Sequence, residues 1–119
     1  MAPFDSVLLL REYGDEDLVR DLAQLLVDTV PEQVDAVTNA VSAGDGAALR
    51  KAAHKLRGSI VAFGMPGAVE CARQLEAMGA AGDLTGADAL SRQLVAEVQS
   101  LRESASAWLT AGENRDLER

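Results

Sequence analysis

The chain has 119 residues, of which 48% are hydrophobic and only 3% aromatic, and 19 acidic against 11 basic residues give a net charge of −8. This length suits one domain with a single modest core, and the apolar content is too high for wholesale disorder. The acidic balance and the scarcity of aromatic rings argue against nucleic acid as a partner, because such binding needs clustered Lys and Arg, and often stacking platforms.

The single cysteine and one short apolar run bear on the cellular compartment of the protein. Cys71 is the single cysteine, so an internal disulfide is excluded, and a reducing compartment fits this usage. The apolar run 7–10 is far too short for a membrane span, and it follows Asp5 rather than a basic segment, which makes it a poor signal peptide. We therefore expect a soluble, cytoplasmic protein with no membrane partner.

Two helices are predicted in the first third of the chain. Residues 3–13 form a short opening helix that stops at Gly14, and Asp15 is the expected N-cap of the next helix. Pro31 interrupts the second helix, so either one kinked helix or two helices are possible. Its predicted inward stripe consists of Leu18, Leu22, Leu25, Leu26 and Thr29, followed by Val30, Val34, Val37 and Val41.

Three further segments carry helical patterns. Asp45 is the expected N-cap of a helix over about 46–63, which the Gly- and Pro-containing run 64–67 ends. A small-residue loop is expected over 79–86, and a charged, frayed tail over 112–119. The predicted inward residues are Ala68, Cys71, Ala72, Leu75 and Met78 in one helix, and Leu90, Leu94, Val98, Leu101, Ala105 and Trp108 in the last.

These patterns together predict an all-α protein. No segment alternates with period two, and a core of Leu, Val and Ala favours helices. We expect an antiparallel, up-and-down four-helix bundle with a short additional N-terminal helix. Residues 1–111 would form the single domain, with a monomer as the default state.

The only histidine, His54, lies in a basic run of this acidic chain. At about 100° per residue, one side of its helix collects Leu49, Ala52, Ala53, Leu56, Ile60 and Phe63. The opposite side groups His54 with Arg50, Lys51, Arg57 and Gly58 at spacings of three and four residues. The imidazole is therefore predicted to face solvent on a basic ridge beside a bare glycine.

This group of residues suits phosphoryl exchange between proteins. A neutral imidazole is nucleophilic and can attack phosphorus, and the cations Arg57, Lys51 and Arg50 can offset the charge of the product. Gly58 has no side chain, so a bulky partner can approach the ring. Positioning and electrostatics dominate phosphoryl transfer in general, which makes such an arrangement sufficient in outline.

The run from Ala53 to Ser59 resembles the signature of histidine phosphotransfer (HPt) domains, roughly Ala-His-x-Leu-Lys-Gly-Ser. Similarity continues through Phe63-Gly64, Cys71, Leu75-Glu76 and Met78-Gly79, covering residues 45–80 by motif and 15–110 by helix order. The chain departs from the pattern in having Arg57 for the usual lysine and Ile60 for a frequent small or hydroxyl residue, with Met65-Pro66-Gly67 an unusual helix junction.

The resemblance implies a phosphocarrier that accepts a phosphoryl group from a receiver-domain aspartate and passes it to another receiver. It implies that His54 is phosphorylated through Nε2, that Arg57 neutralises the phosphate and that Ser59 orients the local hydrogen bonding. Glu76 falls where some members have a polar residue near the histidine, and Lys55 is either a further phosphate contact or a solvated side chain. The expected partners are response-regulator receiver domains and a hybrid sensor kinase.

The resemblance also bears on cofactors and on catalysis. The magnesium needed for transfer would belong to the receiver, so no cofactor or metal is expected here. No phosphate-binding glycine loop is present, which indicates a phosphocarrier without kinase activity. Two other functions remain open: a receiver-binding helical module that is not phosphorylated, and a hydrolase. Receivers are expected to dock over the His54 face and apolar residues such as Leu10 and Leu18.

Overall fold

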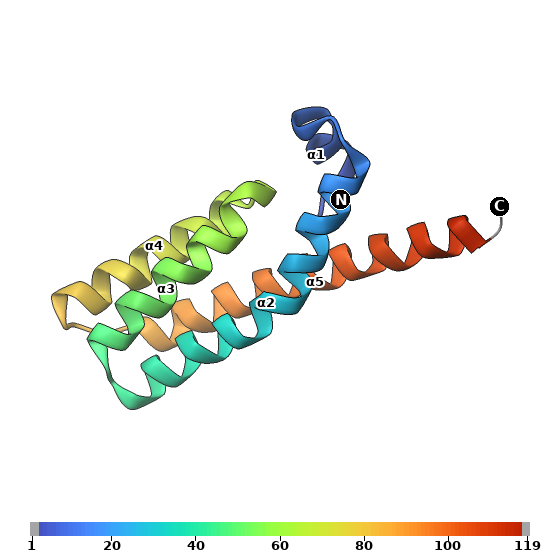
Figure 1. Cartoon of the computed structure of the whole chain (residues 1–119). Coiled ribbons are helices and arrows are strands. Elements are labelled where there is room, and N and C mark those ends of the chain that lie inside the picture. Colours follow the sequence, from blue (N-terminus) through green and yellow to red (C-terminus); the bar gives the residue numbers. More distant parts are fainter. Residues whose placement is uncertain (1–2, 118–119) are drawn as a thin grey trace.

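The computed structural model describes residues 3–117, with side chains for residues 3–112 (Figure 1). Within these residues every regular element is a helix, which confirms the all-α prediction. The elements are α1 (Ser6–Tyr13), α2 (Glu16–Ala43), α3 (Gly46–Ile60), the 3₁₀ turn η1 (Val61–Phe63), α4 (Pro66–Ala81) and α5 (Ala87–Leu117).

The starts of α1, α2 and α3 are fixed by aspartates whose side chains accept hydrogen bonds from free backbone N–H groups. Asp15 accepts hydrogen bonds from the amides of Asp17 and Leu18, and Asp45 accepts one from Ala48, so both predicted N-caps are confirmed. Gly44 ends α2 in the left-handed conformation at φ 65°, which a residue without a side chain adopts at little cost. Short turns therefore separate consecutive helices.

Four helices share one core. Helix α2 packs on α3, α3 on α4, α4 on α5, and α5 back on α2, while α1 packs against α2. Figure 1 shows α3 and α4 side by side, and the C-terminal part of α5 extending away from the other helices. The core is aliphatic except for a small aromatic cluster, in which Phe4 contacts Phe63 and Trp108 at ring-centroid distances of 6.0 and 5.3 Å.

The inward side of α2 differs from the prediction in its first half. The buried residues are Val19, Ala23, Leu26 and Val30, whereas Leu18 is 41% and Leu25 63% exposed. The two candidate stripes lie one residue apart, and both show helical spacing. Because Val34 and Val37 are buried as well, the stripe that begins at Val19 is the one that continues in register along the whole helix.

Four boundaries also differ. Helix α1 begins at Ser6 rather than at residue 3, and α3 ends at Ile60, with the last three residues of the predicted 46–63 helix forming η1. Gly79 and the next two residues belong to α4, so the loop after it is shorter than the predicted 79–86 segment. Helix α5 continues to Leu117, so the fraying expected from residue 112 is not observed as far as that residue. Positions 118–119 of the predicted tail lie outside the described residues.

Pro31 lies inside α2, which is one helix rather than two. Proline has no N–H to donate to the carbonyl oxygen of Val27 four residues earlier. Arg102 of α5 compensates, because its Nε donates to that oxygen at 3.0 Å. A charged donor from another helix thus satisfies the acceptor that proline leaves free, and it also joins α5 to α2.

This contact predicts a conditional effect on stability. Arg102→Met keeps the aliphatic stem but removes the donor, and we expect it to lower the free energy of unfolding by about 1–2 kcal/mol. In a Pro31→Ala background the restored backbone N–H of residue 31 would donate a hydrogen bond to the Val27 carbonyl oxygen. Arg102→Met should then lower the free energy of unfolding by clearly less. Urea unfolding of the four proteins measures this cycle. Equal costs in the two backgrounds would contradict the explanation.

Candidate functional site

His54 lies in the middle of α3 on its outward side. Its side chain is 66% exposed, which confirms the prediction of a solvent-facing ring. The position follows from the period of the helix, because the opposite side of α3 is committed to the core. The buried residues of that side are Leu49, Ala53, Leu56 and Ile60.

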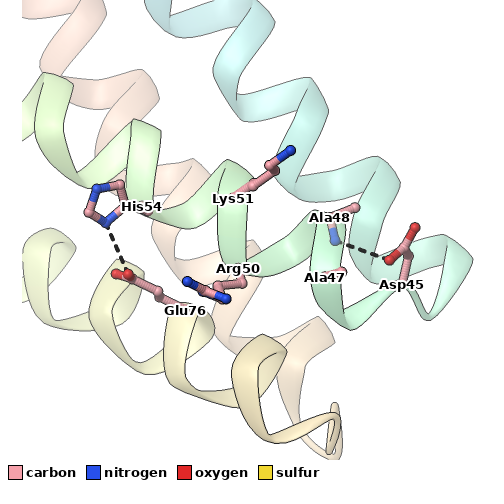
Figure 2. Close-up of a pocket in the computed structure, with 7 residues that line it drawn as sticks. All are labelled: Asp45, Ala47, Ala48, Arg50, Lys51, His54 and Glu76. Atoms are coloured by element: carbon pink, nitrogen blue, oxygen red, sulfur yellow. Dashed lines mark hydrogen bonds and ion pairs between the residues drawn. The ribbon is translucent and has the colours of Figure 1, made fainter.

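The neighbouring helix α4 holds one edge of the imidazole. Nδ1 of His54 lies 2.9 Å from Oε1 of Glu76 (Figure 2). An ionised carboxylate only accepts hydrogen bonds, so Nδ1 must be the donor and carry the proton. In a neutral ring Nε2 then holds the lone pair, and Figure 2 shows this second nitrogen directed away from Glu76.

Arg57 joins the same group from one turn further along α3. Its Nη2 lies 3.2 Å from Glu76 Oε2 and 3.2 Å from His54 Nδ1. Arg57 and Glu76 cannot both be hydrogen-bond partners of Nδ1, because one requires an acceptor and the other a donor. We assign the hydrogen bond to Glu76, the shorter contact, and regard Arg57 as the compensating charge.

The surroundings of Glu76 Oε2 support the role of Arg57 as the compensating charge. The oxygen is buried and makes no aligned hydrogen bond, so the nearby guanidinium is what offsets its charge. The sequence suggested Glu76 and Arg57 separately and gave no indication of their pairing. Each lies on a different helix, and only the packing of α3 on α4 brings them together.

Gly58 lies one turn beyond His54, and a Cβ added there would meet no atom within 4 Å. It lines two hollows. One is shared with His54, Arg57, Val61 and Val69, and the other lies between α2 and α3. The bare backbone at this position therefore connects the histidine with an apolar depression beside α2.

Ser59 and Lys55 are not brought to the ring. The Ser59 hydroxyl donates to the Lys55 carbonyl oxygen at 3.3 Å, a local helix contact, and it lines the hollow beside α2. The Lys55 side chain is exposed, and among the side chains that the structure describes it has no ion-pair partner. The helix period separates both residues from the His54–Glu76 contact.

A larger hollow of about 610 Å³ extends from His54 toward the start of α3. Arg50, Lys51 and Glu76 line it together with the N-cap Asp45 and two alanines of the first turn, and Figure 2 shows Lys51 directed away from Glu76. Neither Arg50 nor Lys51 forms an ion pair within the described part of the chain. Their positive charge is thus available to an anionic group on the ring.

Several large apolar side chains of the described residues are exposed, and the sequence identified only part of them. Leu10, expected at the surface, is partly buried against the core. The exposed members are Val7 (66%), Leu8 (37%), Tyr13 (40%), Leu18 (41%), Leu25 (63%) and Val61 (58%). Val61 adjoins His54 in a shared hollow, and Leu25 lines the hollow that Gly58 also lines.

Other reactive groups of α4 are occupied or shielded. Burial raises the pKa of the Cys71 thiol, and the carboxylates of Glu97 and Glu70 raise it further, so the residue is a poor nucleophile. Hydrogen bonds from Arg73, and then from Gln74, lower the pKa of Glu70 to about 2. Glu70 is therefore committed to its own helix and does not compete with Glu76 for His54.

Two kinds of feature are absent from the described residues. No set of three or more His, Cys, Asp or Glu side chains in this part of the chain could hold a metal ion. No helix described here is long and apolar enough to cross a membrane.

The comparison with protein families agrees with the geometry. Residues 21–104 match the family model described as Hpt domain, and this match spans most of the chain. The chain therefore belongs to the Hpt domain family, whose members carry phosphoryl groups on histidine in phosphorelays. No curated protein and no solved structure gives a significant match.

The Glu76 contact predicts the tautomer of His54. Because the chain has one histidine, long-range ¹H–¹⁵N correlation spectra report both ring nitrogens without overlap. We expect the wild type to have a protonated Nδ1 at a pH where the ring is neutral, and Glu76→Ala to shift the population toward protonated Nε2. Glu70→Ala, which removes a carboxylate from the same helix, should leave the spectrum unchanged. A wild-type ring with protonated Nε2 would refute the assignment.

Proposed function

We propose that this chain is a histidine-containing phosphotransfer protein of a two-component phosphorelay. His54 accepts a phosphoryl group from the aspartate of one receiver domain and passes it to a second receiver. The observation that carries the proposal is the state of the ring: exposed, with Nδ1 bound to Glu76 and Nε2 open to solvent. Membership of the Hpt domain family supports the same interpretation.

The groups present account for every bond and charge that changes in the transfer step. The Nε2 lone pair attacks the phosphorus of the aspartyl phosphate, the P–O bond to the aspartate breaks, and the aspartate leaves as a carboxylate. The imidazole becomes cationic as the P–N bond forms, because Nδ1 keeps its proton. The Glu76 carboxylate at 2.9 Å stabilises that developing charge, so it acts as a positioning and electrostatic residue.

Cations of α3 would stabilise the phosphorylated form. A phosphoryl group adds roughly 1.5–2 negative charges. Arg57 is already near the ring, although it also compensates Glu76, which leaves Arg50 and Lys51 as the uncommitted charges. Helix α3 contains no acidic residue at all, so its local potential opposes the net charge of the chain.

We propose that receivers dock over Gly58. The open backbone there lies between His54 and the apolar hollow that Leu22 and Leu25 line. The exposed side chains Leu18, Leu25 and Val61 would be covered by the partner, with α1 at the margin. Such an arrangement combines an apolar contact with a central charged site, as protein interfaces commonly do.

The remaining parts of the proposal concern organisation. We propose a monomer in which residues 1–111 form one domain and the four long helices follow an antiparallel, up-and-down order. The short turns between consecutive helices favour this order. We also propose a cytoplasmic location, a hybrid sensor kinase upstream, and no kinase activity in the chain itself.

Phosphorylation tests the function directly. Each receiver domain of the source genome, labelled on its aspartate, is incubated with the protein and magnesium. We expect acid-labile, alkali-stable label on the wild type and none on His54→Gln, because only an imidazole nitrogen forms that bond. Binding of a receiver without label would indicate an unphosphorylated interaction module. Rapid release of inorganic phosphate would indicate a hydrolase.

Docking has a separate test. We expect Leu25→Ser to weaken binding of the cognate receiver about tenfold, because the substitution removes apolar area from the contact. Leu25 is 63% exposed, so the fold should be unaffected. Amide shift mapping should show changes on α2 and α3 around Gly58, and changes confined to residues 84–110 would contradict the proposed surface.

A further inference from the structure

Helices α3 and α4 are in close backbone contact at a pair of glycines, Gly46 and Gly79. A Cβ in ideal geometry on Gly79 would lie 2.5 Å from the Gly46 carbonyl oxygen and 2.6 Å from the Arg50 amide nitrogen. A Cβ on Gly46 would lie 2.8 Å from the Gly79 carbonyl oxygen. Real Cβ atoms essentially never come within 3.0 Å of such atoms, and backbone cannot yield as a flexible side chain can.

The position of this contact connects it with the histidine. Gly79 is buried and lies one turn after Glu76 on α4, while Arg50 lies one turn before His54 on α3. The Gly46 carbonyl and the Arg50 N–H stand in the i, i−4 relation of an α-helix, so Gly79 packs directly on the first turn of α3. The glycine contact and the His54–Glu76 contact are therefore neighbours along one helix interface.

We infer that Gly79, packed on Gly46, is a positioning residue for phosphotransfer, because it sets the helix separation at which Glu76 reaches Nδ1 of His54. The effect on phosphotransfer rests on the proposed function, whereas the effect of Gly79 on the Glu76–His54 hydrogen bond does not. The Glu76 carboxylate approaches the ring from α4, and an ion pair with Arg57 already restrains it. A wider α3–α4 separation would lengthen the 2.9 Å hydrogen bond beyond useful range.

Neither backbone conformation nor helix propensity favours glycine at position 79. Gly79 has no positive φ and lies inside α4, where alanine is intrinsically more favourable. Gly58, the other glycine inside a helix near the site, has open space around it. The two glycines thus serve different purposes, one for access to the ring and one for the close approach of two helices.

The test compares Gly79→Ala with Gly67→Ala as a matched control. Gly67 lies in the same helix, and its added Cβ would meet only the end of the Glu97 side chain at 3.1 Å. We expect Gly79→Ala to shift the His54 tautomer as Glu76→Ala does, and to reduce the rate of labelling by phosphoramidate about tenfold, the loss of one charge-assisted hydrogen bond. Gly67→Ala should match the wild type in both measurements.

Each result decides the inference. A folded Gly79→Ala protein with the wild-type tautomer and a rate within about twofold of wild type would overturn it. Should Gly79→Ala not fold, Gly46→Ala decides by the same two measurements, because Gly46 is the first residue of α3 and its added Cβ would clash with one atom only, the carbonyl oxygen of Gly79. If Gly79→Ala shifts the tautomer of His54 but the wild-type protein is not labelled, the positioning role of Gly79 stands and the proposed function is rejected.

Discussion

The close packing of α3 on α4 is the constraint on which the site depends. Three groups with different chemistry meet there: the imidazole of His54, the carboxylate of Glu76 and the guanidinium of Arg57. The carboxylate fixes the proton on Nδ1 and is itself neutralised by the guanidinium. No one of these residues could prepare Nε2 as a nucleophile alone, and helix α3 by itself would present an imidazole free to adopt either tautomer.

The surface around the ring is divided by chemistry. Toward the start of α3 the hollow is lined by Arg50 and Lys51, which suits a negatively charged group. Toward its end, Gly58 and Val61 lead to the apolar depression beside α2. A receiver that docks as proposed would contact both regions, since burying apolar area contributes affinity while charge fixes orientation.

The sequence predicted much of this site because α3 is strongly amphipathic. Its period placed His54 outward and Ala53 inward, and its composition placed cations around the ring. The family resemblance placed Glu76 near the histidine, but its hydrogen bond to Nδ1 and its ion pair with Arg57 could not be predicted, because the rotation of α4 relative to α3 depends on side-chain packing. Likewise, Leu18 and Leu25 were assigned to the core, because two adjacent apolar stripes have equal helical spacing and only burial distinguishes them.

The amino-acid sequence by itself determined the helices and those helix ends that carry an aspartate N-cap or a terminal glycine, since these caps and the 3.6-residue period act through local contacts. It also determined that one exposed histidine would lie among cations. Tertiary structure decided what local rules leave open. It kept α2 continuous through Pro31 by a donor from α5, and it set the distance between α3 and α4 through Gly46 and Gly79. Both outcomes depend on atoms from segments far apart in the chain, whose relative positions are fixed only when the core is packed.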